Sequence, residues 1–292
     1  MKSLSSICFG CEPLGGTDSG DVDLGEIKKA IYKALDLGVN FFDTAGVYGL
    51  GLSEERLSKI LGNRRHEVVI ATKGGLSWKK SPSVRSVVIK DSSPAAIRRD
   101  VESSLSRLRL ERLPIFFVHW PDNNTPIEDT FIELLKIQNE GKIKSIGCSN
   151  FSAQQLRAAC STSQVDYVQL PVNLLNGGID SEVSNICTKN KIQVIAYNIL
   201  ENGLLTGKLD KNSNFPENDR RSRLPLFKGI EFINALSRVE ELKVKAVENN
   251  NNLLKYSINW VLMQKNISSV IIGIKNPVQI EENCSAILTN EL

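Results

Sequence analysis

The sequence predicts an α/β protein that folds as a single-domain (β/α)8 TIM barrel. Short apolar segments alternate with helical patterns along the chain, which is typical of parallel strands joined by crossover helices. Polar residues directly follow several of these segments, as they do at the carboxyl-terminal face of a barrel. The segment GCEPLGG, residues 10–16, lacks the G-x-G-x-x-G spacing that would favour the alternative, an open doubly wound sheet. The 292 residues could hold two domains, but such barrels commonly occupy about 250 residues as one.

Eight segments have the length and apolar content of buried strands, and each precedes a helical pattern. The expected strands are residues 5–10, 39–42, 67–73, 115–118, 144–148, 167–170, 192–197 and 269–272. The expected helices are residues 23–37, 53–61, 94–108, 127–139, 153–160 and 179–189, helices within 230–264, and 277–288.

Capping residues support several helix boundaries. Asp21 or Asp23 lies near the start of the first helix, and Gly38 closes it. Ser53 can cap the second helix, with glutamates in its first turn. Pro94 suits the first turn of the third. The segment 74–93 exceeds the usual length of a connection, so we expect a functional loop that covers a site.

Composition limits the class of protein. Hydrophobic residues make up 41% and charged residues 24% of the chain, which is ordinary for a soluble globular protein. The net charge of +3 is too close to balance to predict a nucleic-acid partner. The chain has no apolar run long enough to span a membrane and no signal peptide at its start. Six scattered cysteines without metal spacing predict reduced thiols, no metal site and a cytoplasmic location.

Four chemically capable side chains follow successive strands. Asp43 ends one apolar run, and Tyr48 follows five residues later in a Gly-rich loop. Lys73 and His119 end two later strands. A buried carboxylate needs a partner because an unpaired buried charge costs several kcal/mol, and Lys73 is the candidate cation. Each residue alone has a structural interpretation: an Asp that caps a helix, or a buried ion pair.

Seven segments, in this order, resemble the aldo-keto reductases, NAD(P)H-dependent enzymes built on a (β/α)8 barrel. They are DTAGVYG with SEERL behind it, VVIATKGG, FFVHW, GKIKSIGCSNFS, YVQLPVNLL, GLLTGK and IIGIKNPVQIEEN. One segment alone is weak, but the ordered set extends over nearly the whole chain. The HWPD run and the long loop 74–93 look most similar to the bacterial branch of inositol- and stress-associated reductases, and potassium channel beta subunits are also similar.

The resemblance implies reduction of a carbonyl to an alcohol. No side chain can donate a hydride, so a nicotinamide cofactor must supply it. Tyr48 is implied as the acid that protonates the carbonyl oxygen, with Lys73 lowering its pKa. Asp43 would hold Lys73, and His119 would orient the substrate or relay the proton. The other histidine, His66, lies in the charged segment NRRHE and is expected on the surface.

The resemblance also assigns residues to the cofactor. Ser149, Asn150 and Gln169 match positions that bind the nicotinamide carboxamide, although Ser and Asn also favour helix N-caps. Tyr197 matches the aromatic that stacks on the nicotinamide ring. The phosphate-binding set is Gly203, Leu205, Lys208, Gly273, Lys275, Gln279, Glu282 and Asn283.

Two departures from the family pattern concern the same end of the site. Relatives have Tyr-Ser-Pro-Leu where this chain has Tyr-Asn-Ile-Leu at residues 197–200, so the missing proline leaves the course of the next loop open. Lys275 stands where relatives often have arginine; it retains positive charge for an adenosine 2′-phosphate, so NADPH is favoured over NADH.

Three residues are candidates for the substrate. Glu12 stands where many relatives have an aromatic residue, and two interpretations remain open: a salt bridge to a lysine, or a side chain that reaches solvent. Trp78 and Trp120 are expected pocket walls, with packing as the alternative. We expect a small-molecule carbonyl or alcohol substrate. A cofactor-binding regulatory subunit with little turnover is the alternative class.

Overall fold

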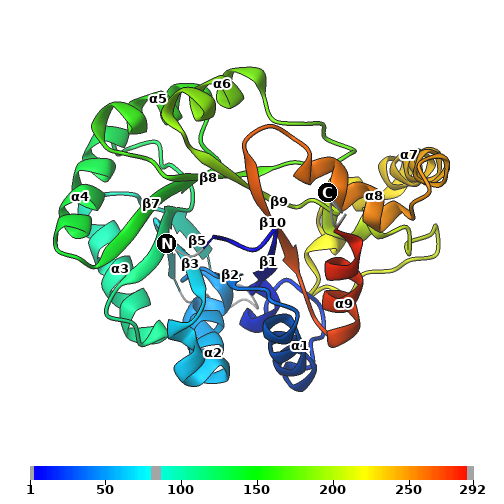
Figure 1. The fold of residues 1–292 in the computed structure, drawn as a ribbon, viewed down its shortest axis with the longest axis horizontal. Coiled ribbons are helices and arrows are strands. Elements are labelled where there is room, and N and C mark those ends of the chain that lie inside the picture. Colours follow the sequence, from blue (N-terminus) through cyan, green and yellow to red (C-terminus); the bar gives the residue numbers. More distant parts are fainter. Residues whose placement is uncertain (1–2, 80–86, 288–292) are drawn as a thin grey trace.

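Eight parallel strands form a closed barrel, in the order β1-β10-β9-β8-β7-β6-β3-β2, in the computed structural model of the protein. The structure describes residues 3–79 and 87–287. Helices surround the barrel on its outside (Figure 1). The predicted (β/α)8 fold is confirmed. The barrel strands are β1 (Ile7–Gly10), β2 (Phe41–Asp43), β3 (Val69–Gly74), β6 (Leu113–Val118), β7 (Ile143–Ser149), β8 (Tyr167–Pro171), β9 (Gln193–Tyr197) and β10 (Ile267–Gly273).

The helices follow the expected segments closely. They are α1 (Leu24–Asp36), α2 (Leu52–Leu61), α3 (Pro94–Leu108), α4 (Ile127–Asn139), α5 (Ala153–Thr162), α6 (Ser181–Asn190), α7 (Gly229–Glu248), α8 (Leu253–Leu262) and α9 (Pro277–Ala286). Asp23 rather than Asp21 caps α1, and its side chain accepts from the Gly25 and Glu26 amides. No helix in the described ranges combines the length and the apolar character needed to cross a membrane.

The expected cap at Ser53 is wrong. Helix α2 begins at Leu52, and its N-cap is Gly51, whose φ of 99° is left-handed. Ser53 lies inside the helix and is fully buried, and its hydroxyl donates to the Cys11 carbonyl at 2.7 Å. The hydroxyl therefore joins α2 to the loop after β1.

The long connection after β3 contains an antiparallel hairpin, which the sequence did not predict. Strands β4 (Leu76–Lys79) and β5 (Val87–Lys90) pair with each other, and residues 80–86 between them lie outside the described part. None of the described hairpin residues lines the pocket described below.

Alternation along the strands decides which residues face the barrel interior. Interior residues such as Phe41, Ala71, Phe117, Tyr167 and Ile195 form one buried cluster inside the barrel. Their neighbours in sequence, Phe42, Ile70 and Phe116 among them, pack outward against the helices. Because side chains alternate with a period of two, the residues two positions beyond the interior set also point inward. Those residues are Asp43, Lys73, His119, Gln169 and Tyr197.

Candidate active site

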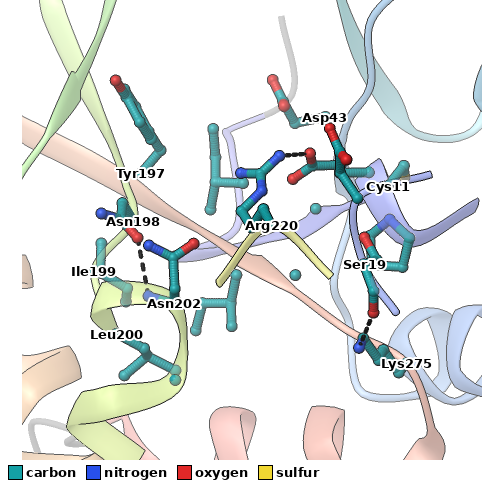
Figure 2. Close-up of a pocket in the computed structure, with 18 of the residues that line it drawn as sticks. Cys11, Ser19, Asp43, Tyr197, Asn198, Ile199, Leu200, Asn202, Arg220 and Lys275 are labelled. Carbon is teal, nitrogen blue, oxygen red and sulfur yellow. Dashed lines mark hydrogen bonds and ion pairs between the residues drawn. The ribbon is translucent and has the colours of Figure 1, made fainter. Parts of the chain in front are cut away.

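A pocket of about 850 Å³ opens at the carboxyl ends of the barrel strands. Interior polar residues form its floor, and the segment between β9 and α7 forms one wall. Figure 2 shows part of this wall, including Asn198, Ile199, Asn202 and Arg220. Of the predicted site residues, all except Leu205 and Trp78 line the pocket.

The four predicted catalytic residues converge at the pocket floor. Lys73 Nζ donates to Asp43 Oδ1 at 2.5 Å, to the Thr44 carbonyl at 2.9 Å and to Tyr48 Oη at 3.3 Å. The His119 ring stands edge-on to the Tyr48 ring, with centroids 5.8 Å apart. Lys73 and Asp43 are 3% exposed, so their charges compensate each other out of water.

Close backbone contact positions the Tyr48 turn. Tyr48 begins the 3-10 turn η2 (Tyr48–Gly51), in which Gly49 has a φ of 59°. A Cβ atom on Gly49 would lie 2.2 Å from the Gly15 carbonyl oxygen. Only glycine permits this approach, so the loops after β1 and β2 are held together at the backbone of Tyr48 and Gly49.

Glu54 supports the same turn from outside the barrel, a role that the sequence did not predict. Its side chain is fully buried in α2. Oε1 accepts from the Thr72 hydroxyl at 2.6 Å, and Oε2 accepts from Arg107 Nε at 2.5 Å. Arg107 packs against Gly51, where a Cβ would meet its Cδ at 2.9 Å. Because Thr72 points outward beside Lys73, this buried network joins β3, α2 and α3 behind the site.

Burial and charge set the protonation states at the floor. Burial by itself lowers the pKa of Lys73, but Asp43 and Tyr48 outweigh it, so the pKa stays raised and the amine is charged. Burial raises the pKa of the Tyr48 hydroxyl, and Lys73 offsets this only in part. Lys73 therefore lowers the Tyr48 pKa, as expected, but burial is the larger effect and the net pKa is raised. Burial and the Lys73 charge lower the pKa of His119 well below its usual value, so the imidazole is neutral at pH 7.

Amide and hydroxyl groups form the adjoining wall. Asn150 Nδ2 donates to the His119 carbonyl at 3.1 Å, and Tyr197 Oη donates to Asn150 Oδ1 at 2.5 Å. The helix cap that could have used Ser149 or Asn150 is instead Ser152, which forms a capping box with Gln155. Ser149 and Asn150 are thus left to the pocket. Burial raises the pKa of Tyr197 to about 12, so its hydroxyl remains protonated.

Positive charge gathers at the far end of the pocket. Lys275 Nζ donates to the Ser19 carbonyl at 2.5 Å, as Figure 2 shows. Burial lowers the pKa of Lys275, and the opposite charge of Asp219 counteracts this. Arg221 donates to both oxygens of Asp219, at 3.0 and 2.6 Å. Asp219 and Arg221 were missed because both lie in residues 209–228, which none of the segments that resemble the family includes.

The other predicted phosphate-site residues lie beside this cluster. Lys208 forms an ion pair with Glu282 at 2.9 Å, so two predicted cofactor residues contact each other. Gln279 Oε1 accepts from the Lys275 amide at 2.8 Å. Gly203, Gly273 and Asn283 also line the pocket.

Leu205 and Trp78 lie outside the pocket lining. The Leu205 side chain is fully buried, in a cluster with Phe227 and Phe232. Its amide donates to the Leu200 carbonyl at 3.1 Å and is therefore already satisfied. Trp78 is half-buried in β4, where it pairs with Val88 of β5, so the expectation of a pocket wall is wrong for the described structure.

Glu12 forms an ion pair, but not with a lysine. Arg220, which also lines the pocket, donates to its carboxylate. Both side chains are partly exposed, at 29% for Glu12 and 39% for Arg220. Trp120 does line the pocket, and Lys90 Nζ lies 4.4 Å from its ring centroid.

Comparisons with known proteins agree with this architecture. Residues 6–292 match the model of the aldo/keto reductase family. The chain is 33% identical over 280 residues to aldo-keto reductase YhdN of Bacillus subtilis, which covers 95% of this chain and 83% of the relative. It is 29% identical over 299 residues to the NADH-specific methylglyoxal reductase of Escherichia coli, covering 99% of this chain and 91% of that protein. The structure of a glycerol dehydrogenase from Gluconobacter oxydans has a TM-score of 0.89 at 34% identity, covering 100% of this chain and 90% of that one. With its closed barrel and the convergence of Asp43, Tyr48, Lys73 and His119, the chain belongs to the aldo/keto reductase family of oxidoreductases.

Proposed function

We propose that the protein is an NADPH-dependent oxidoreductase that reduces an aldehyde, ketone or sugar-like carbonyl to an alcohol, reversibly. The observation that carries the proposal is Lys73 Nζ, which contacts both the Asp43 carboxylate and the Tyr48 hydroxyl in one buried site. Tyr48 is then the proton donor, Lys73 its charged partner, and Asp43 the group that holds Lys73. The family membership and the inward register of Asp43 and Lys73 at the ends of their strands support these roles.

Proton transfer follows from the protonation states. The raised pKa of Tyr48, caused by burial, keeps the hydroxyl protonated and ready to donate to a carbonyl oxygen. As the proton leaves, the Lys73 ammonium stabilises the phenolate. Neutral His119 can donate a hydrogen bond that orients the same oxygen. A nicotinamide, when bound, supplies the hydride.

The pocket has the size and donor set that a dinucleotide needs. Its volume, about 850 Å³, lies near the upper end of ordinary ligand pockets, about 300 to 1,000 Å³. Ser149, Asn150 and Gln169 offer hydrogen bonds for a carboxamide, beside the flat ring of Tyr197. At Gly273 a Cβ atom would meet nothing nearer than Pro13 Cγ at 4.0 Å, so the backbone borders open space.

The preference for NADPH rests on the charged end of the pocket. Lys275 and Arg221 are cations within reach of an adenosine 2′-phosphate, next to the N-terminus of α9. The methylglyoxal reductase of Escherichia coli is NADH-specific by name, so the family alone does not decide the cofactor. Small carbonyls such as methylglyoxal, and polyols such as glycerol as substrates of the reverse reaction, are suggested by the names of the two enzymes.

A turnover screen tests the proposal. Purified protein is assayed with NADPH and with NADH against aldehydes, ketones and sugars, and the Tyr48→Phe variant is run beside it. Steady turnover with NADPH that the variant loses supports the proposal. Tight NADPH binding without turnover on any carbonyl, together with a co-purifying partner, supports a regulatory subunit and overturns the reductase assignment.

A further inference from the structure

A buried carboxylate, that of Glu201, lies behind the wall of the pocket. Glu201 begins the 3-10 turn η4 (Glu201–Thr206) and is 5% exposed. No basic side chain in the described ranges forms an ion pair with it. Its four hydrogen-bond donors are all asparagine amides: Asn173 at 2.8 Å, Asn176 at 2.6 Å, Asn198 at 2.9 Å and Asn202 at 3.2 Å.

This arrangement is costly for a purely structural contact. Removing a carboxylate from water costs several kcal/mol, and amide hydrogen bonds alone must offset it. An apolar side chain would fill the same space without that cost. The carboxylate therefore indicates that this part of the chain needs its geometry fixed by hydrogen bonds. Four amide donors that converge on one carboxylate fix it, and an apolar side chain would not.

The loop after β9 needs its geometry fixed because its backbone is left-handed at several residues. Asn198, Glu201 and Asn202 have φ values of 53°, 43° and 52°, and Gly203 has 97°. A left-handed conformation costs most non-glycine residues about 1 to 2 kcal/mol and asparagine less, so Glu201 above all needs restraint from its surroundings. Ile199 stands at the position where relatives have a proline, whose ring would restrict the backbone directly.

Glu201 and its partners supply that restraint. The carboxylate joins the loop after β9 to the loop after β8 through Asn173 and Asn176. Asn173 also donates to the Asn198 carbonyl at 3.1 Å. The Asn202 amide donates to Asn198 Oδ1 at 3.1 Å, a bond that Figure 2 shows. The turn is thus anchored to the loop after β8 through Glu201, Asn173 and Asn176, none of which lines the pocket.

Asn198, Ile199, Asn202 and Gly203 line the pocket, whereas Glu201 does not. We propose that Glu201 is a positioning residue for the cofactor: its carboxylate, held by four asparagines, keeps the loop 198–203 in the conformation that receives the phosphates of the dinucleotide. The inference rests on the proposed cofactor site. Glu201 acts through the loop and touches neither substrate nor cofactor.

The direction in which one substitution changes NADPH affinity distinguishes this positioning role from a simple effect of charge. A negative charge near an anionic ligand weakens binding, so its removal should tighten binding if charge were the whole effect. Glu201→Gln keeps the shape but turns one acceptor into an NH2 group that faces asparagine donors. The loop then loses its anchor, and positioning predicts weaker binding.

The experiment measures the Kd for NADPH by fluorescence titration, with kcat, KM and thermal stability beside it. We expect Glu201→Gln to raise Kd and the KM for NADPH roughly tenfold, within the effect of about 100-fold that a 1 Å misplacement can have. At saturating NADPH, kcat and its pH profile stay near those of the wild type, because Asp43, Tyr48 and Lys73 are untouched. The matched control is Glu248→Gln, which removes the same charge from the exposed end of α7 and should leave Kd unchanged.

A second variant provides rescue. Asn176 is exposed and lies outside the pocket, so Asn176→Asp contacts no bound ligand. In the double variant with Glu201→Gln, the glutamine NH2 group can donate to the new aspartate, and the original charge is restored. The double variant should therefore recover most of the lost NADPH affinity. If a folded Glu201→Gln variant binds NADPH as tightly as the wild type or more tightly, the inference is overturned while the proposed function stands. The same holds if the double variant does not recover NADPH affinity. Wild-type protein that binds neither NADPH nor NADH overturns the proposed function and the inference with it.

Discussion

Gln169 donates its side-chain amide to Asp43, with Nε2 2.6 Å from Oδ2, while the other oxygen of the same carboxylate accepts from Lys73 at 2.5 Å. One carboxylate therefore orients both the charged partner of Tyr48 and a residue that the family resemblance assigns to the nicotinamide. The bond to Asp43 uses one of the two N–H donors of the NH2 group, so Gln169 has its carbonyl oxygen and one N–H left for other partners. Changes at Asp43 should therefore affect both acid catalysis and cofactor geometry.

Tyr48→Phe should abolish most carbonyl reduction while the fold and NADPH affinity remain. A positioned acid contributes about 100- to 10,000-fold to the rate, and the loss should fall in kcat. Steady-state kinetics with cofactor titration measure both quantities. Turnover close to that of the wild type would show that another group donates the proton.

Lys73→Met should shift the pH profile of alcohol oxidation upward. Oxidation needs the Tyr48 phenolate as base, and Lys73 is the group that lowers the Tyr48 pKa against the effect of burial. The variant also leaves Asp43 without its cation, at a cost to stability of about 3 to 5 kcal/mol. Thermal unfolding beside the pH-rate curve measures both effects. A destabilised variant with an unshifted profile would mean a purely structural ion pair.

Asp43→Asn is the companion variant. Lys73 loses its ionic partner but stays near Tyr48, so we expect a lower rate through misplacement. The Gln169 contact changes from an amide–carboxylate to an amide–amide bond, which should also raise the KM for the cofactor. A change in rate without any change in that KM would argue against coupling through Gln169.

Lys275→Ala should weaken NADPH binding more than NADH binding. Only NADPH carries a phosphate on the adenosine ribose, and Lys275 lies at the cationic end of the pocket beside the N-terminus of α9. Parallel fluorescence titrations with the two cofactors provide the comparison. Equal losses would place the phosphate elsewhere, with Arg221 as the next residue to change.

Asp122→Asn should destabilise the protein at neutral pH and not in strong acid. Burial raises the pKa of this carboxyl, but the amides of Ser92, Asn124 and Thr125 outweigh it and lower the pKa to about 2. Because the pKa of Asp122 is lower in the folded protein than in the unfolded chain, where it is near 3.9, the ionised carboxylate stabilises the fold at pH values above about 3.9. This contribution is lost as the pH falls towards 2. The melting temperatures of the two proteins should converge over that range. A constant difference at every pH would mean that charge is not the cause.

The barrel and the convergence of its strand-end residues could be predicted from the sequence because both depend on local patterns. Alternation with period two sets the inward face of each strand, and a parallel barrel brings every strand end to one rim. Asp43, Lys73 and His119 needed only this register to meet. Asp23, which caps α1, and Pro94, in the first turn of α3, likewise act within their own turns.

The remaining features depend on contacts between distant segments, which no local pattern encodes. The partner of Glu12 is Arg220, 208 residues away in a short 3-10 turn between β9 and α7. Ser53 looked like a cap because its own turn permits one, but the tertiary structure placed its hydroxyl against Cys11. Glu201 has Asn198 and Asn202 close to it in sequence, but Asn173 and Asn176 are 28 and 25 residues away, and only the tertiary structure brings the loop after β8 beside it so that four amides surround the carboxylate. Burial likewise decided the pKa of Tyr48, because desolvation depends on the whole packed fold rather than on the nearest charge.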